Sequence, residues 1–370
     1  MKPITYKDSG VDQELGDEVS SMLYNAAKLS WPNRKGRLGE VFTPFDDFTG
    51  VRVIDVGGLP KGTVMCLGFD GVGTKMEIAE RLDNHNTVAY DLFAMVCDDA
   101  VVRGGEPVLV GSILDVRALN DDNKKPYLGQ VRQLATGYFN AAKAADVAII
   151  NGEVAELGAR VSGYGEFNYN WGAGCVWFAN KDRMLDGKKI VPGDSIVALQ
   201  EYGFRSNGLS LVRKILRDCF GSEWHKGAQH SIAAEHVLTP STIYCAAVSD
   251  MFGGALGEPK AAVHGVAHIT GGGIPGKLGR ALKPSGYGAY LNNLCPVPQV
   301  MKELIEIGHV TPDVAYNTWN MGNGMFIVTP EPEKVLQVAR EHNLEGRVAG
   351  RVTANPGIVI HAYTNEAINF

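Results

Sequence analysis

The sequence has little of what marks a secreted or membrane-spanning protein. Its six cysteines are scattered and no two have CxxC spacing, so we expect reduced thiols and no disulfide framework. The first eight residues lack the apolar core of a signal peptide. Two long charge-free stretches, 284–301 and 314–330, are interrupted by Pro, Gly and Asn, which is unlike a membrane span. We therefore expect a cytoplasmic protein that does not cross a membrane.

An excess of positive charge is also missing. The chain has 35 Lys and Arg against 41 Asp and Glu, which gives a formal net charge of −6. This excludes a nucleic-acid binder that relies on overall positive charge. Hydrophobic residues make up 45% of the chain, enough for substantial cores, so the composition also excludes a disordered protein.

Glycine is the residue type in excess, at 45 of 370 positions. Because glycine lacks a Cβ atom, this content indicates many tight turns and sites lined by backbone. The length alone suggests two to three domains.

Strand and helix patterns alternate along the chain, which favours an α/β fold. Helical spacing of apolar residues predicts helices at 14–29, 87–102, 128–145, 209–219 and 335–342, and short apolar runs predict strands at 64–69, 108–114, 147–150, 196–199 and 325–328. A polar, turn-rich stretch separates the two halves at 180–194. We therefore expect an N-terminal domain over 1–182 and a C-terminal domain over 183–370.

A glycine-rich loop follows the strand predicted at 64–69. It contains Asp70, Gly71, Gly73, Thr74 and Lys75. The order of the last two residues fails the P-loop pattern, and the spacing fails the dinucleotide fingerprint. Even so, the glycines would let the backbone approach a phosphate, the lysine supplies a cation and the aspartate could hold a metal. An ordinary strand-to-helix turn with a surface lysine explains the pattern equally well.

A set of acidic residues lies close behind this loop. Asp91, Asp98 and Asp99 fall in an otherwise apolar predicted helix, and Glu153 follows a predicted strand. Buried acids are costly unless they are paired or bind a metal. Mg²⁺ prefers one or two carboxylates together with phosphate oxygens and water, so these acids and Asp70 predict a magnesium site. A solvated helix face is the alternative.

The second half contains a second glycine run, Gly271, Gly272 and Gly273, ahead of a predicted helix. Free N–H groups and the positive end of the helix dipole make such a start a candidate anion site. His268 just before it is either an acid/base group or phosphate ligand, or a structural histidine. Asn207 also precedes a predicted helix, and could cap it or contact a ligand.

The order of these motifs resembles that of the phosphoribosylformylglycinamidine cyclo-ligase (AIR synthetase) family over nearly the whole chain. The matching segments are 6–12, 70–75, 91–95 with Asp99, 104–107, 206–214, 238–244, 264–273 and 319–322.

The resemblance implies an ATP-dependent ring closure. The amide oxygen of formylglycinamidine ribonucleotide would attack the γ-phosphate of ATP, and an internal amidine nitrogen would then displace the phosphate. The products would be aminoimidazole ribonucleotide, ADP and phosphate. The resemblance also implies two α/β (α+β) domains per chain and a homodimer in which N-terminal-domain strands of both chains form a barrel. Residues 1–45, with Lys7 and Asp8, would form a lid segment over the nucleotide.

The resemblance also implies roles for individual residues. Asp70 and Asp99 would hold Mg²⁺, with support from Asp91 and from Glu153, which matches a family glutamate. Lys75 and the glycines around it would face the phosphates of ATP, as would Asn207. The glycine run at 271–273 would hold a phosphate group. We expect Lys75, Asp70 and His268 to be the catalytic residues.

The sequence departs from the family pattern at three places, one of which is the glycine-rich continuation of the lid at 36–42. Arg205 stands where the family usually has histidine, and Asn151 begins a motif that usually starts with glycine. Arginine keeps a donor but cannot exchange a proton near neutral pH. Two alternatives therefore remain: another phosphoryl-transfer enzyme of the same superfamily, such as a thiamine-phosphate kinase, or a nucleotide-binding paralogue without activity.

Overall fold

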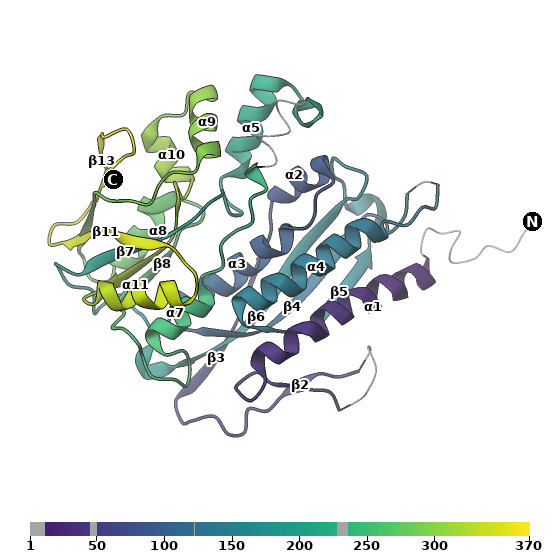
Figure 1. Ribbon diagram of the computed structural model, residues 1–370, viewed down its shortest axis with the longest axis horizontal. Coiled ribbons are helices and arrows are strands. Elements are labelled where there is room, and N and C mark those ends of the chain that lie inside the picture. Colours follow the sequence, from purple (N-terminus) through teal and green to yellow (C-terminus); the bar gives the residue numbers. More distant parts are fainter. Residues whose placement is uncertain (1–11, 45–49, 122, 228–235) are drawn as a thin grey trace, which may run out of the picture.

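The computed structural model describes residues 12–44, 50–121, 123–227 and 236–370. Lys7 and Asp8, predicted to contact the nucleotide, lie outside these ranges. The described chain forms a four-stranded sheet, a seven-stranded sheet and a small two-stranded sheet, with helices packed against the two larger ones (Figure 1). Among the described residues, no helix is both long enough and apolar enough to cross a bilayer.

The four-stranded sheet belongs to the first half of the chain and has the order β3-β6-β4-β5. Its strands are β3 (Thr63–Gly71), β4 (Glu106–Val116), β5 (Ala148–Glu156) and β6 (Tyr169–Asn180). β4 and β5 are parallel, and β6 pairs antiparallel with both β3 and β4. The predicted strands at 64–69, 108–114 and 147–150 are confirmed, although β5 continues six residues beyond the predicted end.

Three long helices cover one face of this sheet: α1 (Gln13–Ser30), α3 (Val88–Val101) and α4 (Leu128–Ala145) (Figure 1). The helix predicted at 128–145 is confirmed with the same bounds. Its apolar stripe is buried, including Val131, Leu134 and Tyr138, because one helical face must pack on the sheet. The short helix α2 (Lys75–Leu82) follows β3. The small sheet pairs β1 (Val41–Phe42) with β2 (Val53–Ile54).

The seven-stranded sheet belongs to the second half and has the order β13-β12-β9-β11-β7-β10-β8. Its strands are β7 (Ser195–Gln200), β8 (Gly265–His268), β9 (Gly288–Leu291), β10 (Asn323–Thr329), β11 (Gly346–Thr353), β12 (Ile358–His361) and β13 (Ala367–Asn369). The first sheet ends at Asn180 and the second begins at Ser195. The predicted domain division at 182/183 falls between them.

The helices of the second half are α5 (Leu209–Phe220), α7 (Cys245–Phe252), α8 (Gly273–Leu282), α9 (Gln299–Ile307), α10 (Pro312–Thr318) and α11 (Pro332–Glu341). The helix α11 packs on strands β7, β10 and β11, and α8 packs on β8. The helix α7 contacts α11 as well as α3, α4 and β4 of the first half. The two halves therefore share a packed boundary, and the candidate site lies along it.

Candidate active site at the boundary of the two halves

Three glycine-marked segments that are far apart in the sequence meet at this boundary. Gly73, in the loop after β3, has a φ of +69°, and an added Cβ atom would lie 3.9 Å from the carbonyl oxygen of Ser206. A Cβ atom on Gly271 would lie 3.7 Å from the side-chain nitrogen of Asn207. The structure thus brings together the predicted phosphate loop, Asn207 and the start of α8.

The second glycine run lets α8 begin in a confined space. Gly272 and Gly273 have φ values of +91° and +59°, a region that residues with a side chain adopt at a cost. A Cβ atom on Gly273 would come within 2.0 Å of the carbonyl oxygen of Tyr316. Gly271 and Gly272 are exposed, so the helix start is open on the side that faces Asn207. The buried Oδ1 atom of Asn207 has no hydrogen-bond partner among the described residues.

Lys75 follows the loop after β3 that takes part in this meeting of segments, and it is paired with Asp91. The Lys75 Nζ atom is 2.7 Å from Asp91 Oδ1, and neither side chain is exposed to solvent. Lys75 also donates to the carbonyl oxygen of Thr239 at 2.7 Å, and the Ser241 hydroxyl donates to Asp91 Oδ1 at 2.5 Å. Burial raises the pKa of Asp91, and Lys75 opposes that rise. In this arrangement Lys75 neutralises a buried carboxylate, so the predicted contacts with phosphate and metal would require the pair to open.

Asp98 is the second buried acid of α3, and Arg205 neutralises it. The two side chains are fully buried and 2.8 Å apart. Backbone N–H groups of Tyr244 and Cys245 donate to the other carboxylate oxygen at 2.9 and 2.8 Å. Arg205 also pairs with buried Glu201 at 2.8 Å. Burial opposes the charge of Arg205, but the two carboxylates outweigh it and raise its pKa.

Arg205 also fixes the tautomer of His268. Its Nη2 atom donates to His268 Nε2 at 2.7 Å. Because a guanidinium has only donors, His268 Nε2 must accept and the ring proton must lie on Nδ1. That nitrogen lies 2.7 Å from Asp99 Oδ1 and donates to it. Both ring nitrogens are engaged in this arrangement, which fits the structural alternative for His268; its predicted catalytic role stays a prediction.

Among the described acids at this boundary, Asp99 and Asp70 form no ion pair with a lysine or arginine and remain open to a ligand. The side chain of Asp99 is 57% exposed. Burial opposes its ionisation, but His268 outweighs this effect and lowers the pKa of Asp99. Burial raises the pKa of Asp70, the Gly71 N–H group opposes the rise, and the charge of Asp99 adds to it. The two carboxylates therefore lie close enough to influence each other, with pKa values moved in opposite directions.

This donor set fits Mg²⁺ bound together with phosphate. Within the described part of the chain, no group of three or more His, Cys, Asp or Glu side chains is arranged to hold a metal ion. Mg²⁺ commonly takes only one or two protein carboxylates and fills its other positions with phosphate oxygens and water. Asp70 and Asp99 meet that requirement.

Lys277 is a functional candidate that sequence reasoning did not single out. It lies one turn into α8 and its charge acts on both Asp70 and Asp99. It forms no ion pair with a described carboxylate, and burial lowers its pKa, with the charge of Arg280 adding to this effect. The only sequence signal was a lysine four residues after the second glycine run.

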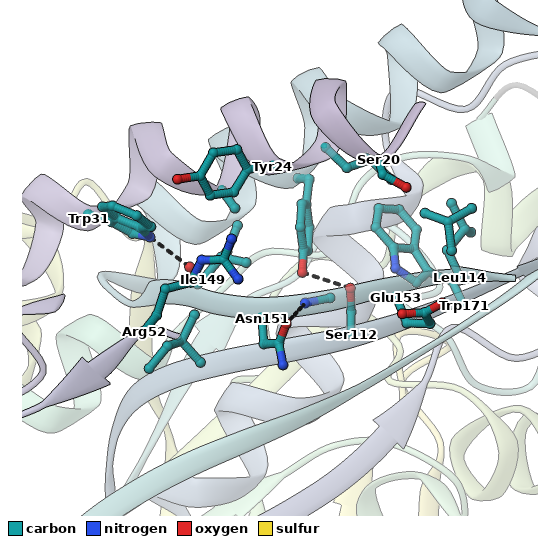
Figure 2. A pocket seen from close by; sticks show the side chains of 16 residues that line it. Ser20, Tyr24, Trp31, Arg52, Ser112, Leu114, Ile149, Asn151, Glu153 and Trp171 are labelled. Atoms are coloured by element: carbon teal, nitrogen blue, oxygen red, sulfur yellow. Dashed lines mark hydrogen bonds between the residues drawn. The ribbon is translucent and has the colours of Figure 1, made fainter. Parts of the chain in front are cut away.

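Glu153 lies elsewhere, in the wall of a pocket between α1 and the first sheet (Figure 2). This pocket has a volume of about 320 Å³ and is lined by the aromatic residues Tyr24, Trp31, Tyr138 and Trp171. The indole nitrogen of Trp171 is buried without a hydrogen-bond partner among the described residues. We refer to this cavity as the aromatic pocket.

The aromatic pocket adjoins a groove on the outer face of the first sheet. Ser112, Asn151, Gly152 and Glu153 line both cavities, and Asp70 lines the groove. Glu153 is thus connected to Asp70 through the groove, but it does not line the cavity beside Asp99.

Both halves of the chain match known family profiles. Residues 51–176 match the N-terminal domain of AIR synthase related proteins, and residues 191–362 match their C-terminal domain. These matches define the class: a two-domain protein of the AIR synthase related type.

Curated relatives narrow this class. The chain is 30% identical to the phosphoribosylformylglycinamidine cyclo-ligase of Pyrococcus furiosus over 362 residues, which covers 97% of this chain and 98% of the relative. It is 32% identical to the enzyme of the same name from Picosynechococcus, with 96% and 98% covered. The chain belongs to the phosphoribosylformylglycinamidine cyclo-ligase family.

Solved structures share the fold at low sequence identity. Escherichia coli HypE, a hydrogenase maturation protein, has a TM-score of 0.59 at 14% identity, with 96% of this chain and 95% of that chain covered. Thiamine-monophosphate kinase from Stenotrophomonas maltophilia has a TM-score of 0.58 at 13% identity, with 91% and 95% covered. At this identity the likeness concerns the fold alone.

Proposed function

We propose that the protein closes the imidazole ring of aminoimidazole ribonucleotide, starting from formylglycinamidine ribonucleotide and ATP. The observation that carries this proposal is the 30% identity over nearly the full length of both chains to a cyclo-ligase. The amide oxygen attacks the γ-phosphorus, an O–P bond forms and ADP leaves. The amidine nitrogen then bonds to the activated carbon and phosphate departs with the oxygen.

The described residues serve this reaction mainly by positioning and by charge. Phosphoryl transfer depends on alignment of the reacting atoms and on neutralisation of phosphate charge. Asp70 and Asp99 would hold Mg²⁺, which would supply positive charge at the phosphates when bound. His268 holds Asp99 in place, and Arg205 holds His268. The exposed backbone of Gly73 and Thr74, with the half-buried Gly71 beside them, would contact phosphate oxygens.

The aromatic pocket is a suitable receptor for the adenine of ATP. Its volume of about 320 Å³ lies in the range of small-ligand sites, and aromatic rings stack well on a planar base. Figure 2 shows Tyr24 on the helix side of the pocket and Ser112 on the sheet side, where the Ser112 hydroxyl is hydrogen-bonded to the Tyr138 hydroxyl at 2.7 Å. Tyr24→Ala should therefore raise the KM for ATP more than the KM for the ribonucleotide.

A homodimer is part of the proposal. The outer face of the first sheet carries exposed apolar side chains, including Phe69 at 75% exposure, together with Met65, Leu67 and Ile113. Large exposed apolar faces usually mark interaction sites. Pairing of two such faces would form a barrel. All six cysteines are free thiols, which supports a reducing compartment such as the cytoplasm.

The decisive experiment measures ADP release and aminoimidazole ribonucleotide formation from purified protein, Mg²⁺, ATP and formylglycinamidine ribonucleotide. Matching amounts of the two products are expected. Asp70→Asn should abolish both while leaving the circular dichroism spectrum unchanged. ADP release with thiamine monophosphate instead would favour the kinase alternative. Nucleotide binding without turnover of either substrate would favour a paralogue without activity.

A further inference from the structure

A small basic cavity lies beside Asp99 and His268. It has a volume of about 170 Å³ and forms where α8 faces the end of α3. Asp99 and His268 line its inner wall, and Lys277, Arg280 and Arg103 line the rest together with the backbone of β8. We refer to it as the basic cavity.

The charges around the basic cavity are not balanced. Three cationic side chains face one carboxylate, and that carboxylate already accepts a hydrogen bond from His268. Within the described chain, none of the three cations forms an ion pair. Arg103 donates only to the carbonyl oxygen of Leu185 at 3.4 Å. Lys277 and Arg280 are three residues apart on one helix, where like charges repel.

The contrast with the buried cations is informative. Lys75, Arg34 and Arg205 each form an ion pair with a described carboxylate at 2.7 or 2.8 Å. By contrast, Arg103 and Arg280 are exposed and Lys277 is half-buried, so these three cations are accessible from solvent. The lining of the basic cavity carries a net positive charge of about two, which an anion of matching charge would neutralise.

We propose that the basic cavity is a phosphate-binding subsite that takes a phosphate monoester or inorganic phosphate. At about 170 Å³ it is smaller than the roughly 300 Å³ at which sites for whole small ligands begin, so it suits a phosphate group rather than the whole of a nucleotide. The identity of the phosphate rests on the proposed function. It is either the 5′-phosphate of the ribonucleotide or the orthophosphate that the reaction releases.

The first test is direct binding to the full-length protein, measured by isothermal titration calorimetry at low ionic strength. The probes are ribose 5-phosphate and inorganic phosphate. Lys277→Met and Arg280→Met should each weaken binding by about tenfold, the effect of losing one charge-assisted hydrogen bond. Lys283→Met, an exposed change at the end of α8 outside the cavity, should leave binding unchanged. Unchanged binding in both cavity variants would overturn the proposal.

Steady-state kinetics then distinguish the two sources of phosphate. If the cavity takes the 5′-phosphate, Lys277→Met raises the KM for the ribonucleotide with little change in kcat, and phosphate competes with that substrate. If it takes released phosphate, the KM is unchanged and product inhibition by phosphate weakens. In both cases the Lys277→Arg variant, which keeps the positive charge, should behave nearly like the wild type.

The binding test is independent of catalysis, so the two proposals can fail separately. If the protein binds ribose 5-phosphate through Lys277 but makes no aminoimidazole ribonucleotide, the subsite proposal holds and the proposed function is wrong. If the protein makes the product but the Lys277→Met and Arg280→Met variants match the wild type in binding and kinetics, only the subsite proposal is wrong.

Discussion

Arg205 is a residue whose backbone and side chain are both constrained. Its φ of +58° lies in the left-handed region, which a non-glycine residue occupies at a cost of about 1 kcal/mol or more. The guanidinium compensates through contacts to Asp98, Glu201 and His268. These three side-chain acceptors and the Thr242 carbonyl oxygen at 2.6 Å surround one planar group, which suits arginine better than lysine.

Arg205→Lys should therefore lower both the free energy of unfolding and the apparent affinity for Mg²⁺. A single ammonium cannot reach all three partners, and an unpaired buried carboxylate costs about 3–5 kcal/mol. His268 would lose its fixed tautomer, so we expect the Mg²⁺ concentration for half-maximal activity to rise several-fold while kcat at saturating Mg²⁺ falls less. The exposed Arg217→Lys is the control. An unchanged Mg²⁺ requirement in a folded variant would show that Asp99 does not depend on this arrangement.

His85 gives stability a pH dependence. It is buried and contacts the Tyr169 hydroxyl at 3.0 Å and Asp83 at 3.3 Å. Burial lowers its pKa from 6.5, and Asp83 opposes this shift. The unfolded chain therefore binds the proton first as the pH falls. The contribution of His85 to the free energy of unfolding is fully present above pH 6.5. It decreases below that pH, with a slope of at most about 1.4 kcal/mol per pH unit.

His85→Gln should reduce that slope. The measurement is the urea midpoint between pH 7.5 and pH 5.0 for the wild type and the variant. His236→Gln, at an exposed position, serves as the control and should keep the wild-type slope. Equal slopes in all three proteins would exclude His85 as the source.

At the scale of elements, the pair formed by Lys75 and Asp91 joins α2 to α3, and the Thr239 carbonyl ties both to the second half. Lys75→Met should destabilise the protein by about 3–5 kcal/mol because Asp91 would remain charged and buried. Adding Asp91→Leu should recover much of the loss. Thermal unfolding of both variants gives the comparison.

A surface pair provides the matched control for this prediction. Lys334 contacts Glu331 at 2.7 Å on the surface of the protein, and Lys334→Met should change stability by less than about 1 kcal/mol. If Lys75→Met were equally mild, the buried pair would not contribute to the junction of α2 and α3.

The predictable elements are those with one clear periodicity. The helix α4 was predicted with its observed bounds because its apolar stripe has strict helical spacing. The strand β6 was not predicted. It carries Gly172 and Gly174 between aromatic residues, so the alternation of apolar and polar residues is interrupted, and its role as the central partner of β3 and β4 comes from tertiary pairing.

The site was predictable in its parts but not in its assembly. Each glycine segment and Asp70 were recognisable, because backbone freedom and charge are local properties. The burial of Lys75 depends on Thr239, 164 residues away, and local sequence carries no signal of that contact. Arg205 was identified as a departure from the family, but its partners Asp98 and His268 lie 107 and 63 residues away in the sequence.

At the scale of the whole molecule, the exposed face of the first sheet is the surface on which the proposed dimer depends. Phe69 covers the position of Gly174 on the neighbouring strand, where an added Cβ atom would come within 2.8 Å of the ring. Leu67 and Ile113 extend the same apolar face. Exposed sheet faces of this kind are liable to associate, and a second copy of the chain provides a matching surface.

The wild-type protein should therefore sediment as a dimer at micromolar concentration, and the double variant Leu67→Glu/Phe69→Glu should sediment as a monomer. Val314→Glu, an exposed apolar position on α10, should leave the dimer intact. Sedimentation of the wild type as a monomer only would contradict the proposed barrel.

The contacts of Arg205 also limit how freely the two halves can be exchanged between relatives. Asp98 belongs to the first half, while Arg205, Glu201 and His268 belong to the second. A hybrid that joined this first half to a second half with histidine at position 205 would bury Asp98 without its cation. We therefore expect a functional chimera to require that both sides of this charge network come from the same parent.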